Sequence, residues 1–247
     1  MRTVGSVVSI VAVSLALGLL ALAPLGWRLG WWSYGFALLS IIPLAGAMAA
    51  IAVAVSLLTL ALARAQLGRP TFVALLAVLA VGAGLVYLPL RYERQFRTFP
   101  PINDISTDTD NRPAFEAALA ARAAEDADRS DTPDPELSEL QRAGYPDIVP
   151  VRSALPAGEA FSKALAVAQA MRGWTIVVVD RDKGRIEASA RTFWFGFTDD
   201  IVIRVTADGG GSRIDMRSAS RIGGSDIGVN AARIRAYMRA VSQAVGQ

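Results

Sequence analysis

Histidine and cysteine are both missing from the 247-residue chain, and lysine occurs only at Lys163 and Lys183. Without histidine there is no imidazole base and no Ser-His-Asp or Cys-His nucleophile system. Without cysteine there are no thiolate zinc sites and no disulfides. Chemistry is left to carboxylates, the two lysines, tyrosine, and serine or threonine without a histidine. We therefore assign no catalytic residue, metal site or cofactor, and leave enzymatic activity open.

Charge is scarce in the first third of the chain, where four arginines are the only charged residues before residue 91: Arg2, Arg28, Arg64 and Arg69. The rest holds 21 basic and 22 acidic residues, so it is nearly neutral although the whole chain carries a net charge of +3. A near-neutral domain without a basic run is a poor nucleic-acid binder. We expect no nucleic-acid partner.

Three uncharged apolar runs occupy residues 3–27, 29–63 and 70–90. Each can cross the ~30 Å hydrocarbon layer, which needs about 20 apolar residues. We place the second span near Tyr34–Leu62, with an aromatic interfacial belt before it at Trp27, Trp31, Trp32 and Tyr34. No span contains Asp, Glu or Lys, which disfavours an ion or proton pathway. Residues 1–92 are thus predicted to be a three-helix transmembrane region that anchors the chain in the lipid bilayer.

The orientation in the membrane is indicated by the short loop RAQLGRP, which carries Arg64 and Arg69. A basic loop is typical of the cytoplasmic side, so we expect a cytoplasmic N-terminus. The C-terminal domain would then be periplasmic, on the inner (cytoplasmic) membrane of a Gram-negative cell. The count of flanking arginines is nearly balanced, which leaves the reverse orientation open. Ala21-Leu22-Ala23 resembles a signal-peptide cleavage site, but Pro24 directly after it argues against cleavage.

Beyond the spans we expect an extended stalk over 93–113, a short helix and an acidic loop over 114–144, and an α+β domain over 145–247. The acidic, proline-containing stretch 125–136 is interpreted as a mobile loop. An apolar, β-branched run predicts a strand at 174–180, and alternating apolar residues predict strands at 185–195, 200–207 and 213–220. Helical spacing predicts helices at 156–172 and about 226–244. With an extended segment at 145–153, the order is β-α-β-β-β-β-α.

This order predicts an antiparallel sheet with both helices on one face. The opposite face would carry charged side chains, namely Glu187, Arg191, Arg204, Arg213, Asp215 and Arg217. We expect a solvated face with cross-strand ion pairs, or else a docking surface for a partner or an anionic headgroup.

A series of motifs then resembles the family called domain of unknown function 1499. They are Tyr145–Ile148, the GW-x-IV-x-x-D-x-x-x-GRIEA pattern of 173–188, 192–197, DDIVIRV at 199–205, and 212–235. PPINDISTD at 100–108 is similar to the family's leading segment, so the resemblance covers roughly residues 98–240. It implies an exported or membrane-attached domain but no activity. The element order also resembles the helix-grip repeats of an outer-membrane assembly lipoprotein, at the level of fold alone.

The first candidate site is the polar stretch FPPINDISTDTDN, at 99–111. Asp104, Ser106, Asp108 and Asp110 alternate like the first half of a calcium loop, but Thr109 replaces its central glycine and Phe115 stands where a bidentate glutamate is needed. Local turns made by Asn and Asp side chains are the simpler interpretation. A ligand or partner site involving Asn103, Asp104 and Asp108 remains open. We also hypothesise that Asp104 or Asp108 pairs with Arg217 or Arg221.

The second candidate site lies around the start of the last helix. We expect Ser225 to be its N-cap, with Asp226 in its first turn. Arg217, Arg221, Asp226, Asn230 and Arg233 could converge there, either as a structural network or as an anion-binding pocket.

Two functions from different classes follow. The first is a membrane-anchored binding or scaffolding module of the cell envelope, with an envelope protein or lipid as partner. The alternative is a small-molecule or anion binder, or a carboxylate-dependent enzyme, that uses both candidate sites. The segment WFGFTDD at 194–200 is expected to form a hairpin whose clustered Trp194, Phe195 and Phe197 belong to the core, or suit a membrane surface or partner where the rings are exposed.

Overall fold

The computed structural model describes residues 2–125 and 135–246. They form two compact units: the first contains the described residues up to 95 together with 194–196, and the second contains the other described residues. Most of the acidic stretch 125–136, expected to be a loop, lies outside the described residues. The predicted α+β class is confirmed: apolar helices are followed by an antiparallel sheet domain with a C-terminal helix.

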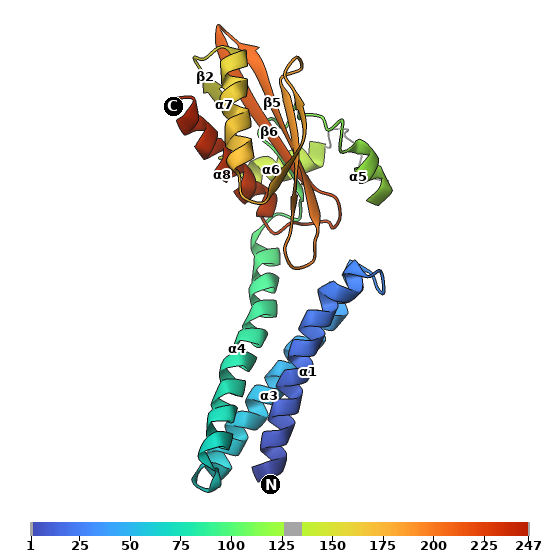
Figure 1. Ribbon diagram of the computed structural model, residues 1–247, viewed down its shortest axis with the longest axis vertical. Coiled ribbons are helices and arrows are strands. Elements are labelled where there is room, and N and C mark those ends of the chain that lie inside the picture. Colours follow the sequence, from blue (N-terminus) through green and yellow to red (C-terminus); the bar gives the residue numbers. More distant parts are fainter. Residues whose placement is uncertain (1, 126–134, 247) are drawn as a thin grey trace. The chain divides into compact units, whose positions relative to one another are not determined.

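The first unit is helical (Figure 1). Its elements are α1 (Arg2–Arg28), α2 (Tyr34–Phe36), η1 (Ala37–Ile41), α3 (Ile42–Ala63), η2 (Arg64–Gln66) and α4 (Arg69–Thr98). Three segments are long and apolar enough to cross a membrane, Val4–Arg28, Tyr34–Gln66 and Arg69–Thr98, as predicted. Helices α1 and α3 lie side by side and α4 contacts α3, where small residues such as Ala49 and Gly82 allow close packing.

Two prolines shape these helices. Pro43 has no N–H to donate backwards, and the turn before it widens into the π segment η1. Pro24 lies inside α1, and the Ala23 carbonyl beside it accepts a hydrogen bond from Trp32 Nε1 at 3.0 Å. Gly26 leaves room for the Trp32 ring, because a side chain there would overlap it.

The second unit is built on one antiparallel sheet. Its strands are β1 (Asp104–Ser106), β2 (Val151–Ser153), β3 (Trp174–Asp180), β4 (Arg185–Arg191), β5 (Thr198–Asp208) and β6 (Gly211–Ser220). The order is β1-β6-β5-β4-β3, and β2 pairs with the other end of β6. The four predicted strands are confirmed, although the second ends at Arg191 rather than at residue 195.

Helices α7 (Ala157–Ala170) and α8 (Val229–Ala244) cover one face of the sheet, which we call the inner face (Figure 1). Their apolar sides meet alternate strand residues such as Ile186, Ile203 and Met216 in the main core. Helix α8 begins at Val229, not at residue 226 as predicted, because Ile227 and Gly228 adopt positive φ angles of 50° and 84°.

The opposite face of the sheet, which we call the outer face, is not the solvated surface that we expected. Glu187, Asp215 and Arg217 there are 2%, 0% and 2% exposed. Residues 107–125, which include α5 (Leu119–Glu125), cover this face, and Phe115 packs against Val202 and Ala219. Charged strand residues can be buried in this way because the covering segment supplies their partners.

The segment expected to be an extended stalk, 93–113, takes part in regular structure. Its first six residues continue α4, and residues 104–106 form β1. Within 114–144 the predicted short helix is α5, and a further helix, α6 (Pro135–Gly144), was not predicted. The Gln141 side chain of α6 bonds both backbone groups of Ser106 and so attaches α6 to β1.

Candidate functional site

The sheet separates the eight predicted site residues into two groups. Those on the outer-face side are Asp104, Asp108, Arg217 and Arg221, whereas Asn103, Asp226, Asn230 and Arg233 gather on the side of α8. Neighbouring residues of β6 point to opposite faces, so Arg217 and Ser218 belong to different clusters. The five residues expected to converge near the last helix therefore do not form one pocket.

Asp104 is the centre of the outer cluster. Arg217 donates to both of its carboxylate oxygens, at 3.0 Å from Nε and 2.8 Å from Nη2. Arg112 Nη1 adds a third contact at 3.1 Å. Burial by itself would raise the pKa of Asp104, but Arg217 and Arg112 hold it below its usual value. The hypothesis of an Asp104–Arg217 pair is thus confirmed.

A second group of charged side chains on the outer face surrounds the Phe115 ring. The guanidinium carbons of Arg122 and Arg217 lie 4.8 Å and 4.7 Å from the centre of its ring. Arg122 also reaches Asp200 at 3.1 Å, and Arg221 reaches the same carboxylate at 3.0 Å. Arg221 therefore pairs with Asp200 rather than with Asp104 or Asp108.

Asp108 pairs with Arg213 at 2.7 Å, while its other oxygen accepts hydrogen bonds from the N–H groups of Asp110 and Asn111. This is the local turn expected from the sequence. Arg213 and Arg204 both bond Asp215, which is fully buried. Acid and base side chains of this patch thus neutralise one another.

On the inner face, Asn230 uses its whole amide and is completely buried. Its Nδ2 donates to the Asn103 carbonyl at 2.9 Å and to Ser220 Oγ at 3.0 Å. Its Oδ1 accepts from Ser218 and Arg233, and Arg233 also bonds Asp199 at 2.6 Å. Asn230 therefore faces the sheet.

Asp226 precedes α8 and accepts hydrogen bonds from the N–H groups of Gly228 and Asn230. It therefore caps the helix, whereas Ser225, the expected cap, bonds only the Ile227 N–H. Burial raises the pKa of Asp226 despite these bonds. Burial also raises the pKa of Tyr145 to about 12, and within the described residues the Tyr145 hydroxyl has no hydrogen-bond partner.

Comparison with known families adds one match. The sequence pattern of the family described as "Protein of unknown function (DUF1499)" matches residues 104–241, which is more than half of the chain. The chain belongs to this family. Neither the curated proteins nor the solved structures contain a match. The DUF1499 segment begins at the first residue of β1 and includes the whole sheet, α7, α8 as far as residue 241, and residues 107–125 on the outer face.

Both buried clusters lie within or directly beside this DUF1499 segment, and their geometry is that of a framework. The outer cluster holds residues 104–125 on the sheet, and the inner cluster attaches Asn103 to α8. Sequence reasoning missed Arg112, Arg122, Asp199 and Asp200 as their partners. The adjacent residues Asp199 and Asp200 could have indicated these two clusters, because neighbouring side chains in a strand point to opposite faces of the sheet.

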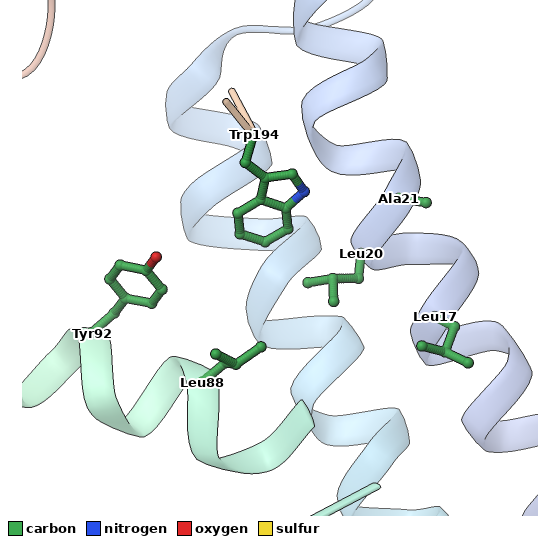
Figure 2. Close-up of a pocket in the computed structure, with 6 residues that line it drawn as sticks. All are labelled: Leu17, Leu20, Ala21, Leu88, Tyr92 and Trp194. Atoms are coloured by element: carbon green, nitrogen blue, oxygen red, sulfur yellow. The ribbon is translucent and has the colours of Figure 1, made fainter. Parts of the chain in front are cut away.

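Figure 2 shows a hollow in the first unit of this DUF1499 chain. It is lined by Leu17, Leu20 and Ala21 of α1, Leu88 and Tyr92 of α4, and Trp194. Only the Tyr92 hydroxyl and the Trp194 indole nitrogen are polar there. This lining has no charged group to bind an anion or to transfer a proton.

Proposed function

We propose that this protein is an integral membrane protein whose C-terminal domain is a non-enzymatic binding or scaffolding module of the cell envelope. Three apolar helices support the membrane attachment. The basic loop with Arg64 and Arg69 supports a periplasmic domain on the inner membrane. Helices α7 and α8, both packed on one face of an antiparallel sheet, support the helix-grip interpretation.

The observation that carries this proposal is the internal pairing of the charged clusters. Asp104, Asp200 and Asp215 are each bound by two arginines. Asp200 and Asp215 are buried, and the Asp104 side chain is 14% exposed. A catalytic or anion-binding site needs polar groups that can reach a ligand. Here the same groups fix the cover and the sheet to each other, which favours a rigid module that presents its surface to a partner.

A suitable surface is the edge strand β3. It pairs only with β4 among the described strands, and its Val177 and Val179 side chains are 53% and 42% exposed. An edge strand with exposed apolar side chains can accept an extended segment of another protein as a further strand. We propose an envelope protein as that partner.

The test uses the full chain in its native membrane, with a photo-crosslinking amino acid at Val177 or, as the control, at Asp182 in the adjacent β3–β4 turn. We expect one discrete protein adduct from position 177 and none from 182. Equal labelling at both positions, or none at either, would contradict an edge-strand partner. An alkaline phosphatase fusion after Gln247 tests the orientation independently, because the enzyme is active only outside the cytoplasm.

The alternative, an anion or small-molecule binder, predicts a different result. Phosphate or a dicarboxylate, added at constant ionic strength, would raise the unfolding midpoint of the full chain. Replacement of Arg221 by Gln would abolish that rise.

A further inference from the structure

The turn between β4 and β5 presents aromatic side chains in a fixed geometry. Thr192 N–H donates to the Phe197 carbonyl at 2.8 Å, and Phe197 N–H donates to Thr192 Oγ1 at 2.8 Å. Gly196 supplies the positive φ of 74° that closes the turn. Phe193 is nevertheless 96% exposed, the most exposed of the large apolar side chains described. A closed turn that leaves a phenyl ring this exposed suggests a binding surface.

Trp194 adds to this aromatic turn, which we define as residues 192–197. Its ring packs edge-on against Phe195 at a centroid distance of 5.2 Å, and Phe195 itself is 5% exposed. The buried Phe195 ring therefore packs against Trp194 and supports its position. Phe and Trp together provide apolar area with one N–H group, a composition that suits the boundary between lipid and water.

The register of the sheet places the aromatic turn at the end where the chain arrives from α4. Arg191 is opposite Thr198, Asp199 is opposite Ser220, and Ala219 is opposite Asp104, the first residue of β1. The β3–β4 turn at 181–184 lies at the other end of the sheet, since β4 begins beside it.

The connection between α4 and this end of the sheet is short and attached to the domain. It consists of residues 99–103, which span at most about 17 Å when extended. Ile102 and Asn103 accept hydrogen bonds from Asp226 N–H and Ser220 N–H at 3.3 Å and 2.9 Å. Phe99 packs so closely on Gly228 that an added Cβ would lie 2.9 Å from its ring. The domain therefore cannot move far from the end of α4.

Helix α4 ends in the headgroup region by length and charge. Its 30 residues correspond to about 45 Å, more than the ~30 Å hydrocarbon layer. Its last turns carry the exposed Arg91, Arg94 and Arg97, and Arg191 is exposed directly before the aromatic turn. These cations complement the anionic headgroups found at such a surface.

We propose that the aromatic turn inserts Phe193 and Trp194 into the interface of the same bilayer that holds the apolar helices. The occupant of this surface is lipid, and the turn is a second point of membrane attachment for the domain. This inference does not depend on the partner proposed for β3.

The absence of cysteine allows a direct test with the full chain in nanodiscs of mixed zwitterionic and anionic phospholipid. Phe193→Cys and, as the matched control at the other end of the sheet, Asp182→Cys are each labelled with a nitroxide. We expect accessibility to a water-soluble nickel relaxant to be at least about threefold lower at 193 than at 182, because the interface excludes it. Accessibility to oxygen should be higher at 193.

A second measurement keeps the native side chains. Nanodiscs that contain a phospholipid with a photoreactive acyl chain are irradiated with the unmodified protein, and the labelled peptides are identified by mass spectrometry. We expect labelling of the peptide with residues 193–197 and none of the peptide with 181–184. Equal nickel accessibility at 193 and 182, or no lipid on the 193–197 peptide, would overturn the proposal.

Discussion

Asp104 pairs with two arginines whose side chains are only 2% and 4% exposed, Arg217 and Arg112. Asp104→Asn would leave both cations buried without their counter-ion. We expect the free energy of unfolding at pH 7 to fall by roughly 3 kcal/mol or more, the usual cost of breaking a buried pair from one side. Urea unfolding of the full chain in nanodiscs measures this.

The matched control is Asp110→Asn. Its partner Arg142 is 55% exposed and Asp110 itself is 84% exposed, so we expect a loss below about 1 kcal/mol. A loss at Asp110 as large as that at Asp104 would show that burial does not determine the cost.

The same variant predicts a pH dependence. The pKa of Asp104 is lower in the folded than in the unfolded protein, so its stabilising effect is complete above the unfolded pKa and is lost as pH falls through the folded value. The difference between wild type and Asp104→Asn should therefore be constant from pH 7 to about pH 5 and shrink below about pH 4. Unfolding curves at pH 7, 5 and 3.5 test this. An unchanged difference at pH 3.5 would contradict it.

Two buried tyrosines allow us to compare how much a hydrogen-bonded and an unbonded hydroxyl contribute to the free energy of unfolding. Tyr237 donates to the Ala164 carbonyl at 3.0 Å, whereas the Tyr145 hydroxyl has no partner among the described residues. We expect Tyr237→Phe to lower the free energy of unfolding by about 1 kcal/mol, and Tyr145→Phe to leave it unchanged or raise it slightly. Thermal and urea unfolding of the two variants check this. A larger loss for Tyr145→Phe would mean that its hydroxyl is hydrogen-bonded, for example to water.

At the scale of elements, Asn230 links α8, β6 and the segment that follows α4 through its bonds to Ser220 and Asn103. Asn230→Ala removes these bonds and leaves the Asn103 carbonyl with the Ser220 N–H alone. We expect a loss of roughly 1–3 kcal/mol and faster exchange of the Ser220 and Asp226 amide hydrogens. Hydrogen exchange monitored by mass spectrometry measures it, with exchange in α7 as the internal control. Unchanged exchange at Ser220 would exclude this coupling.

The elements that could be predicted are those whose side chains reveal burial by themselves. Uncharged apolar runs predicted the apolar helices, a β-branched apolar run predicted β3, and alternating apolar residues predicted β4 to β6. Helix α6 and strand β1 could not be found, because their residues are polar and are ordered by contacts such as Gln141 with Ser106. The burial of Arg217 was equally hidden, since it depends on Asp104 and Phe115, more than 100 residues earlier in the chain.

At the scale of the whole molecule, the short connection at 99–103 joins the apolar helices to a domain with its own core. An insertion of Gly-Gly-Ser-Gly-Gly-Ser between Thr98 and Phe99 leaves the contact of Phe99 with Gly228 and the bonds of Ile102 and Asn103 on the domain side. We therefore expect the free energy of unfolding of the domain to change by less than about 1 kcal/mol, as surface-loop extensions usually do.

The insertion should act instead on membrane contact. Two aromatic rings bind an interface weakly, and their contact depends on the high effective concentration that a short tether provides. In the nitroxide-labelled Phe193→Cys protein, we expect the insertion to raise nickel accessibility toward the value at Asp182→Cys, while Asp182→Cys itself does not change. A rise at both positions would indicate a general loosening of the domain. No rise at 193 would mean that the turn binds lipid strongly enough without the tether, and that Phe99–Asn103 does not determine its position.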